Sequence, residues 1–465
     1  MENIALQDEF RPCVPTVFGP KDYREFRARL EEMDRILAVS GLEHAFLTHH
    51  LEACPDLPQS RWSRLFNIAR KALRYKLLLA ITGDPFRDLA HRVADSKMFP
   101  DGEVTRLIHD LNNAVGAAAH AAELLYTAIE IRFDKIFADT TCVKANIHFP
   151  VDWVLLRDAV RTLIAAVKLI RQQGLMHRMP PPATFLAQIN KLCMAMTQGR
   201  RQKDADKTRK SIFRRMKRLL KVVEEHGVRY RNMLDTRWKQ TSWSELEKNV
   251  VLDRMNNILR QLPQAVEQAT KRLLAGESVE NKDKILSLYE HDVHVLVRGK
   301  AGAEVEFGNA LYLAEQQDGL IVDFQFIQGQ PPADSKLVQD SLARIHENYG
   351  KPSSYTGDRG FSSKANKELL EKLEIEDAIC PRSVPEMQER LKEPDFRDNQ
   401  TRRASTEARI SVMKNCYIGN PLRSKGFKNR GTSVCWCVLA HNLWKLSDMA
   451  VRNKQALEEP PAVAA

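Results

Sequence analysis

The sequence has 465 residues, of which 43% are hydrophobic and 28% charged, a composition that excludes a disordered chain and a membrane-embedded one. A chain of this length is too long to fold around a single hydrophobic core, so two or three domains are expected. Lys and Arg number 71 against 60 Asp and Glu, and the net charge of +11 favours a polyanionic partner, either nucleic acid or an anionic membrane surface.

Residues 1–130 predict a helical N-terminal domain. Positions 60–82 keep an apolar stripe at helical spacing, and the Gly-Asp-Pro that follows ends this helix. Short consecutive helices with basic residues are compatible with a DNA-binding helix-turn-helix module and equally with a plain bundle. The first residues show no basic segment leading into an apolar one, so we expect no secretory signal and a cytoplasmic protein. The weakly polar run 114–131 contains two glutamates, which argues against a membrane span.

A strand rich in β-branched and aromatic residues is predicted at 135–143, and a long helical region follows at 151–283. Its centre, 200–221, carries eleven Lys or Arg against two Asp. The apolar face beneath this charge consists of Ile212, Phe213, Met216, Leu219, Leu220 and Val223. Such a helix is compatible with a grip on the DNA backbone, a membrane-surface helix or a solvated face. We interpret 151–283 as a basic insertion that grips DNA or contacts a second protomer. The candidate DNA contacts are Arg214, Arg215, Lys217 and Arg218.

From residue 284 the pattern changes to short strands and helices. Strand-like runs are predicted at 284–290, 293–299, 303–316, 319–329, 353–361 (a strand running into a turn) and 375–382. Helices are predicted at 335–350, 362–374 (capped by Ser362 or Ser363), 401–414 and 431–451, with a charged loop at 383–399. Without the insertion these elements predict an α/β fold with a mixed sheet of about five strands. The tail 451–465 is expected to be disordered.

Three carboxylates in these elements are candidates for one site. Asp139 lies inside the first strand, Asp358 lies where "TGDRGF" leaves a strand, and Glu407 is the lone acid of the helix "TRRASTEARISVMK". Each has an ordinary explanation, as a strand-end polar residue, a turn former and the partner of an i,i+4 ion pair. Gly357 and Gly360 are expected to let the backbone turn sharply beside Asp358. In mixed sheets, sites form at strand ends and on helices packed there, so the three can converge.

Five segments together resemble the DDE transposases of bacterial insertion sequences, most closely the ISNCY group. They are "DTTCVKANIHFP", "VEFGNALYLAEQQDGLIVDFQFIQGQPPADSKL", "TGDRGF", "TRRASTEARISVMK" and "LRSKGFKNRG…CWCVLAHNLWKL". The resemblance implies a ribonuclease H-like catalytic core over 131–150 and 284–450. It further implies that Asp139, Asp358 and Glu407 are the catalytic acids and hold two Mg²⁺ ions, for which Mn²⁺ can substitute. Hard divalent cations take oxygen ligands, so carboxylates suit this role.

Related families carry a signature on the last helix: Tyr, two residues, Arg, three residues, Glu, six residues, Lys. Arg403, Glu407 and Lys414 keep this spacing, whereas Gln400 stands at the Tyr position. The departure puts in doubt any contact of an aromatic ring with the DNA end. Arg403 and Lys414 are expected to hold phosphates near the metals.

The resemblance implies an enzyme that cleaves the ends of an insertion sequence and joins them to target DNA. Two metals activate water for cleavage, and the same metals activate the freed 3′-hydroxyl for strand transfer. The expected partners are the terminal inverted repeats, target DNA and a second copy of the chain, with no membrane and a nucleoid-associated location. Arg423 and Lys425 of "PLRSKGFKNR" are further candidate DNA contacts, with a solvated loop as the alternative. Two other functions stay open: an inactive, transposase-derived DNA-binding protein, and a metal-dependent nuclease without strand transfer.

Overall fold

The structure is a computed structural model that describes residues 28–29, 31–33, 35–36, 133–199, 204–300 and 303–458. Most of the predicted N-terminal domain, 1–130, therefore lies outside the described residues. The fold is mixed α/β, as predicted, and it divides into two compact units. We call them the core unit (Met1–Ala145 and Asn309–Ala465) and the insertion unit (Asn146–Gly308). The predicted insertion, 151–283, lies within the second.

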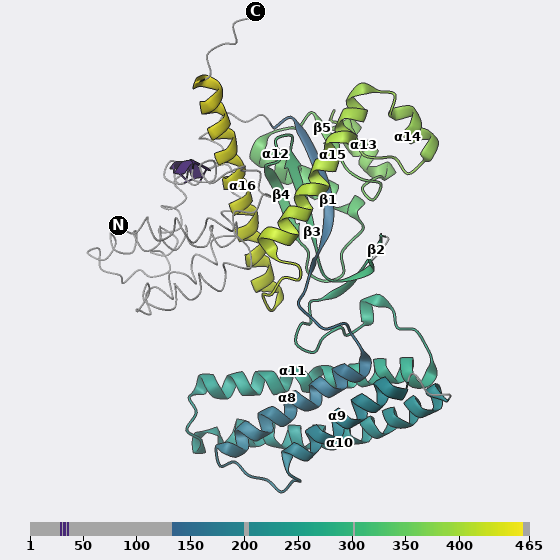
Figure 1. Ribbon diagram of the computed structural model, residues 1–465, viewed down its shortest axis with the longest axis vertical. Helices are drawn as coiled ribbons and strands as arrows, with labels where there is room; N and C mark the ends of the chain where they lie inside the picture. The colour runs from purple at the N-terminus through teal and green to yellow at the C-terminus, as the bar shows by residue number, and fades with distance from the viewer. Residues whose placement is uncertain are drawn as a thin grey trace, which may run out of the picture. The chain divides into compact units, whose positions relative to one another are not determined.

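The described strands form one mixed six-stranded sheet (Figure 1). Its strands are β1 (Lys135–Lys144), β2 (His294–Lys300), β3 (Ala303–Gln316), β4 (Ile321–Phe326), β5 (Ser354–Thr356) and β6 (Glu376–Asp377). The order is β2-β3-β1-β5-β6, and β4 pairs with β3. β5 runs parallel to β1 and to β6, whereas β3 is antiparallel to β2 and β4. A mixed sheet of this size agrees with the prediction of about five strands.

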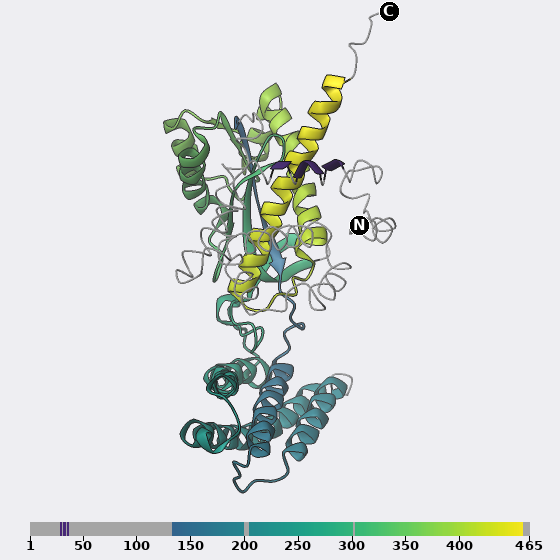
Figure 2. The ribbon, with the colours of Figure 1, turned by 90° about the vertical axis from the view of Figure 1, so that its left-hand side faces the viewer.

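The core unit also contains helices. They are η8 (Asp334–Lys336), α12 (Val338–Tyr349), α13 (Lys364–Lys372), α14 (Val384–Arg390), α15 (Pro394–Val412), η9 (Met413–Ile418) and α16 (Phe427–Glu458). Of these, α12, α13, α15 and α16 pack against the sheet. Ser363 caps α13 by accepting a bond from the Asn366 amide, as predicted. The core lies between α16 and strands β3 and β4, where Leu313, Phe324 and Leu443 are buried together. In Figure 2, α16 runs along the sheet.

Two expectations for the core unit and one for the insertion unit differ from the structure. The segment 383–399 is not a loop but contains α14 and the start of α15, because Ser383 caps the first helix and Pro394 begins the second. Of the tail 451–465, the residues as far as Glu458 extend α16, whereas 459–465 lie outside the described residues. The strand-like run 284–290 forms no strand. Its Ile285 amide instead donates to the Gln268 side chain at 2.7 Å.

The insertion unit contains a bundle of four helices, as predicted for a helical region. They are α8 (Asp152–Gln172), α9 (Pro182–Gln198), α10 (Ala205–Arg237) and α11 (Glu245–Thr270), with the short turns η5 (Trp238–Gln240), η6 (Lys271–Ala275) and η7 (Asn281–Asp283). Of the predicted apolar face of α10, all but the half-buried Leu219 are buried in the bundle. A capping box between Ser244 and Glu247 starts α11. Among the described helices, none is long and apolar enough to cross a membrane.

Asn442 joins α16 to the first residue of β4. Its Oδ1 accepts from the Ile321 amide at 2.9 Å, and its Nδ2 donates to the Ile321 carbonyl at 2.8 Å. The side chain is 1% exposed, so both of its polar groups are satisfied inside the protein. Asn442 is thus a packing residue of the core unit.

Candidate active site

Neighbouring elements carry the three candidate acids. Asp139 lies in β1, and Asp358 follows β5 by two residues. Phe137 and Thr356 are register partners in the parallel β1–β5 pair, so each aspartate lies two residues beyond the same paired position. Glu407 lies on α15, which packs against both strands. The sheet and this helix therefore bring together residues that are far apart in the sequence.

The electrostatics of Asp139 show that the other two acids are near it. Burial, followed by the charge of Asp358, raises the pKa of Asp139 from its usual 3.8 to about 6. Glu407 acts in the same direction, while the Thr140 amide, which donates to Asp139 at 2.7 Å, and Arg403 act against the rise. Negative charge from three carboxylates is thus concentrated around β1.

Asp358 is held in a tight turn by its neighbours. Its Oδ1 accepts a bond from the Gly360 amide at 2.7 Å. The backbone turns here, and the two glycines of the turn are needed for space, since neither has a positive φ. A Cβ at Gly357 would lie 2.9 Å from the Phe361 ring, and one at Gly360 would lie 2.6 Å from a carboxylate oxygen of Asp334.

Asp334 is therefore a fourth carboxylate beside the turn, and the sequence analysis did not identify it. It starts η8, and its Oδ2 and the Oδ1 of Asp358 both lie within 3 Å of the space beside Gly360. Its charge also contributes to raising the pKa of Tyr355, after burial and Tyr312. An aspartate after "QPPA" has no feature that separates it from an ordinary turn residue, so the sequence offered no signal.

Glu407 is turned toward a cation on its own helix. Arg403 Nη1 donates to Glu407 Oε1 at 2.7 Å, and the Glu407 side chain is 53% exposed. Arg403 Nε also donates to Gln400 Oε1 at 3.3 Å, and Gln400 Nε2 donates to the Ala378 carbonyl at 2.7 Å. Gln400, at the position where related families have Tyr, thus links α15 to the residue after β6.

A second set of charged contacts fixes α15 to the turn between β3 and β4. We call it the hairpin clamp, and its members are Glu315, Arg402, Thr406 and Arg409. The Glu315 side chain is 3% exposed and accepts from both terminal nitrogens of Arg402 at 3.0 Å, from Thr406 at 2.7 Å and from Arg409. Arg402 also lies over the Phe137 ring of β1 at 4.7 Å.

The hairpin clamp explains why α15 buries few apolar side chains. Arg402, Thr406 and Arg409 recur at steps of four and three and so share one face of the helix, beside the face of Arg403 and Glu407. Gly319, with φ +90°, leaves the room that Arg409 occupies, since a Cβ there would lie 2.3 Å from the guanidinium carbon. Sequence reasoning missed this role, although the spacing of the three donors was a signal for it.

The donor atoms suit magnesium, but their arrangement is incomplete. Carboxylate oxygens are the ligands that Mg²⁺ prefers, and the mutual repulsion at Asp139 is what a cation relieves. Within the described ranges, however, no group of three or more His, Cys, Asp or Glu side chains is arranged to hold a metal ion. Arg403 holds one of the two carboxylate oxygens of Glu407, so a metal bound by all three acids would share this carboxylate with Arg403.

The predicted DNA contacts lie in both units. In the core unit, Arg403 is paired with Glu407, Lys414 is half-buried, and Arg423 and Lys425 are exposed in the segment before α16. In the insertion unit, Arg214, Arg215 and Arg218 are exposed on α10. Lys217 instead points to α11, where its Nζ donates to Thr270 Oγ1 at 3.3 Å.

His441 and Trp444 of α16 are buried in the core. His441 shares a hydrogen bond of 2.9 Å between its Nε2 and the Gly319 carbonyl oxygen, so this nitrogen is the donor. Burial lowers the pKa of His441 to about 4, and the nearby Arg409 cation contributes. A neutral, buried imidazole of this kind is not positioned as a base for the three acids.

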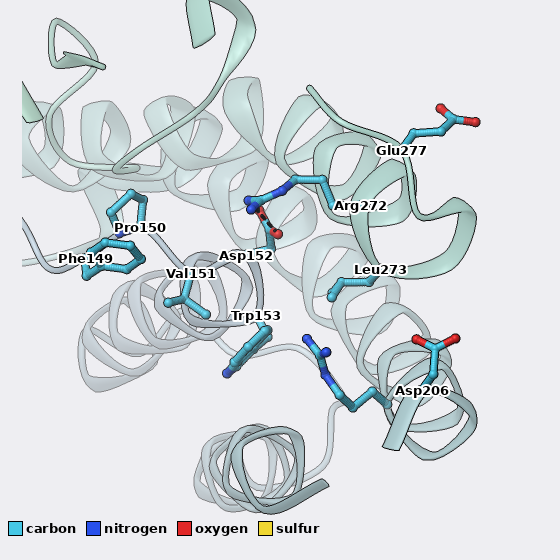
Figure 3. A pocket seen from close by; sticks show the side chains of 10 residues that line it. Phe149, Pro150, Val151, Asp152, Trp153, Asp206, Arg272, Leu273 and Glu277 are labelled. Atoms are coloured by element: carbon cyan, nitrogen blue, oxygen red, sulfur yellow. Dashed lines mark hydrogen bonds and ion pairs between the residues drawn. The ribbon is translucent and has the colours of Figure 1, made fainter. Parts of the chain in front are cut away.

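A pocket of about 270 Å³ in the insertion unit lies outside this acidic site (Figure 3). Its main charges are already matched: Asp152 is paired with Arg272 at 2.9 Å and accepts from Gln268 at 2.9 Å. Arg209 lies over the Trp153 ring at 5.3 Å. We assign it no function.

Comparison with known proteins gives no relative: no family model, no curated protein and no solved structure matches this chain.

Proposed function

We propose that the protein is a metal-dependent DNA transposase that cleaves the ends of an insertion sequence and transfers them into target DNA. The observation that carries the proposal is that Asp358 and Glu407 lie near Asp139. Together with burial, the charges of these two acids raise the pKa of Asp139. These are the acids that the resemblance to DDE transposases picks out. They also occupy the expected elements, namely the first strand, the segment after the fourth strand of the core unit, and a late helix.

The same placement supports a ribonuclease H-like core. In the part of the core unit that the structure describes, the strands follow one another as β1, the second half of β3, β4, β5 and β6. β1 lies in the middle of the sheet, between β3 and β5, so that a carboxylate on it faces helix α15 and the end of β5. The fold assignment is part of the proposal and rests on this order together with the motifs.

Asp139 and Asp358 are the residues that would hold the metal, with Glu407 joining them after its separation from Arg403. Bound Mg²⁺ or Mn²⁺ supplies an activated water or 3′-hydroxyl and neutralises the phosphate. The protein itself positions the DNA. Once released from Glu407, Arg403 donates to a phosphate beside the acids, and Lys414, Arg423 and Lys425 contact the backbone further along.

The remaining parts of the proposal concern partners and location. The DNA substrates are the terminal inverted repeats and the target, two copies of the chain act together on them, and the protein works at the nucleoid in the cytoplasm. The bundle of the insertion unit provides a second DNA contact through α10. Its net positive helix and the overall charge of +11 support this role.

One observation favours a second candidate, an inactive DNA-binding protein derived from a transposase. Glu407 pairs with Arg403, and the described residues include no group of three or more His, Cys, Asp or Glu side chains arranged to hold a metal ion. In this alternative the Arg403–Glu407 pair is permanent, and the acids only shape the fold.

The test is cleavage of duplexes that carry the sequences flanking the gene, with full-length protein and Mg²⁺. Asp139→Asn, Asp358→Asn and Glu407→Gln should each lower cleavage and strand transfer at least about a hundredfold, with DNA affinity nearly unchanged. Glu376→Gln, an exposed carboxylate on β6, is the matched control and should cleave like the wild type. Binding without cleavage by the wild-type protein would favour the inactive DNA-binding protein. Cleavage without joining would favour a nuclease.

A further inference from the structure

A groove of about 450 Å³ runs between α9 and α10, which lie beside each other in the bundle (Figure 1). Its apolar wall is made of Phe185 and Leu192 from α9 and Leu219 and Val222 from α10. Phe185 and Leu192 are buried, whereas Val222 is 42% exposed, so the groove opens to solvent along α10.

Three cations line the groove, from both of its sides. Lys191 belongs to α9, and Arg215 and Arg218 belong to α10. All three are exposed, and Gln188 is the other polar side chain of the lining, which contains no carboxylate. Among the described residues no carboxylate forms an ion pair with any of the three. Elsewhere in the same bundle Lys210 and Lys271 are each paired with an acid one turn away.

Of the four DNA contacts predicted on α10, only two point toward the groove. Arg215, Arg218 and Val222 recur at steps of three and four and share the face toward the groove. Lys217 lies on the opposite side of the helix, where it donates to Thr270 of α11. Arg214 is exposed but does not line the groove.

We propose that this groove binds the sugar–phosphate backbone of duplex DNA, with Lys191, Arg215 and Arg218 on its phosphates. The inference deepens the proposed function and rests on it for the choice of DNA as the polyanion. Three unpaired cations around a lining without acids complement a chain of regularly spaced negative charges. The apolar wall suits the C–H faces of deoxyribose, which backbone contacts include.

The burial of the aromatic residue in the groove favours double-stranded over single-stranded DNA. Proteins that bind single strands stack bases on open aromatic rings. Phe185, the one aromatic residue of this lining, is 5% exposed, and its ring is in edge-to-face contact with His226. No aromatic ring in the groove is therefore available to stack on a DNA base. We conclude that the groove recognises the sugar–phosphate backbone of the duplex.

The test measures binding of a fluorescently labelled duplex to the full-length protein by anisotropy over a range of salt concentrations. Lys191→Gln, Arg215→Gln and Arg218→Gln should each lower the slope of log affinity against log salt by about 0.9, and the triple variant by two to three. Lys217→Gln is the matched control, since it removes one charge from the same helix outside the groove. It should keep the wild-type slope.

Two results would overturn the proposal. One is a triple variant with wild-type slope and affinity, or a Lys217→Gln control that loses as much as the groove variants. The other is displacement of the duplex by an acidic amphipathic peptide that binds more tightly, which would indicate a protein partner. Thermal unfolding of each variant verifies that the bundle is intact.

The outcome is separable from that of the proposed function. Duplex binding that needs the three cations, without cleavage by the wild-type protein, would support the groove and refute the transposase. Cleavage that is lost in Asp139→Asn, together with a triple variant that binds like the wild type, would refute the groove alone.

Discussion

Arg403 and Glu407, one turn apart on α15, are joined by a hydrogen bond of 2.7 Å between Nη1 and Oε1. The bond occupies one oxygen of the Glu407 carboxylate, whose charge also raises the pKa of Asp139. Any divalent ion that recruits Glu407 therefore competes with Arg403. The strength of this competition is small, because pairs at this spacing on helix surfaces are weak.

Arg403→Ala should strengthen metal binding while weakening DNA cleavage. Loss of a pair of about 0.5 kcal/mol corresponds to roughly a twofold gain in affinity for Mn²⁺, since Glu407 becomes available without opening the bond. Cleavage should fall because a phosphate contact is lost. Calorimetric titration with Mn²⁺ measures the first effect. Arg397→Ala on the same helix, whose nearest acid is Asp398 at 3.9 Å, is the control and should leave affinity unchanged. An unchanged or weaker affinity in Arg403→Ala would show that the pair does not restrain Glu407.

Asp139→Asn should make the metal-free protein more stable at alkaline pH. The folded protein holds the Asp139 proton up to about pH 6, whereas the unfolded chain releases it near 3.8, so the wild type loses stability as pH rises between these values. The loss amounts to about 3 kcal/mol at most, and asparagine, which keeps the acceptor for Thr140, avoids it.

Urea unfolding from pH 3.5 to 8, without divalent cations, measures this difference. The variant should exceed the wild type above pH 6 and match it below pH 4. Added Mg²⁺ should stabilise the wild type at pH 8 and leave the variant unaffected. Parallel profiles for the two proteins would contradict a strained carboxylate at this position.

Glu315→Gln should lower both stability and cleavage through the hairpin clamp. Arg402 and Arg409 would keep their charges in a partly buried place without the carboxylate that neutralises them, and the unfolding free energy should fall by about 3 kcal/mol. Cleavage should fall further than stability predicts, because α15 also carries Glu407. DNA affinity should stay unchanged, which a general loss of folding would not allow.

The control for this variant is Glu374→Gln, which removes an ion pair with Lys351 on the surface of the same unit. The Glu374 side chain is 86% exposed, so little change is expected in either measurement. If Glu315→Gln behaved like this control, the clamp would be dispensable for placing α15.

Local patterns predicted most of the elements. The strand at 135–143 is found as β1, and the helix ending at Gly350 is found as α12, with φ +87° at that glycine. The strand-like run 284–290 failed because its apolar residues, such as Ile285 and Leu288, pack on the helical bundle and satisfy an apolar pattern without a sheet. Periodicity alone does not distinguish these two environments.

The candidate site was predictable in position but not in orientation. Motif order identified Asp139, Asp358 and Glu407, and strand pairing explains why the two aspartates lie at equivalent points. The bond of Glu407 to Arg403 depends on side-chain torsions that no motif encodes. The clamp residue Glu315 lies 87 positions before Arg402, and such long-range partners become visible only in the folded chain.

The contact between Asn442 and Ile321 has a consequence for how copies of this protein meet. β4 pairs with β3 alone among the described strands, and an unpaired strand margin is a place where a strand from another molecule can add. Asn442 satisfies both groups of Ile321 with a side-chain amide, as a neighbouring strand would. The helix thereby blocks the start of that margin, and intermolecular sheet growth, the first step toward aggregates, has no free template there.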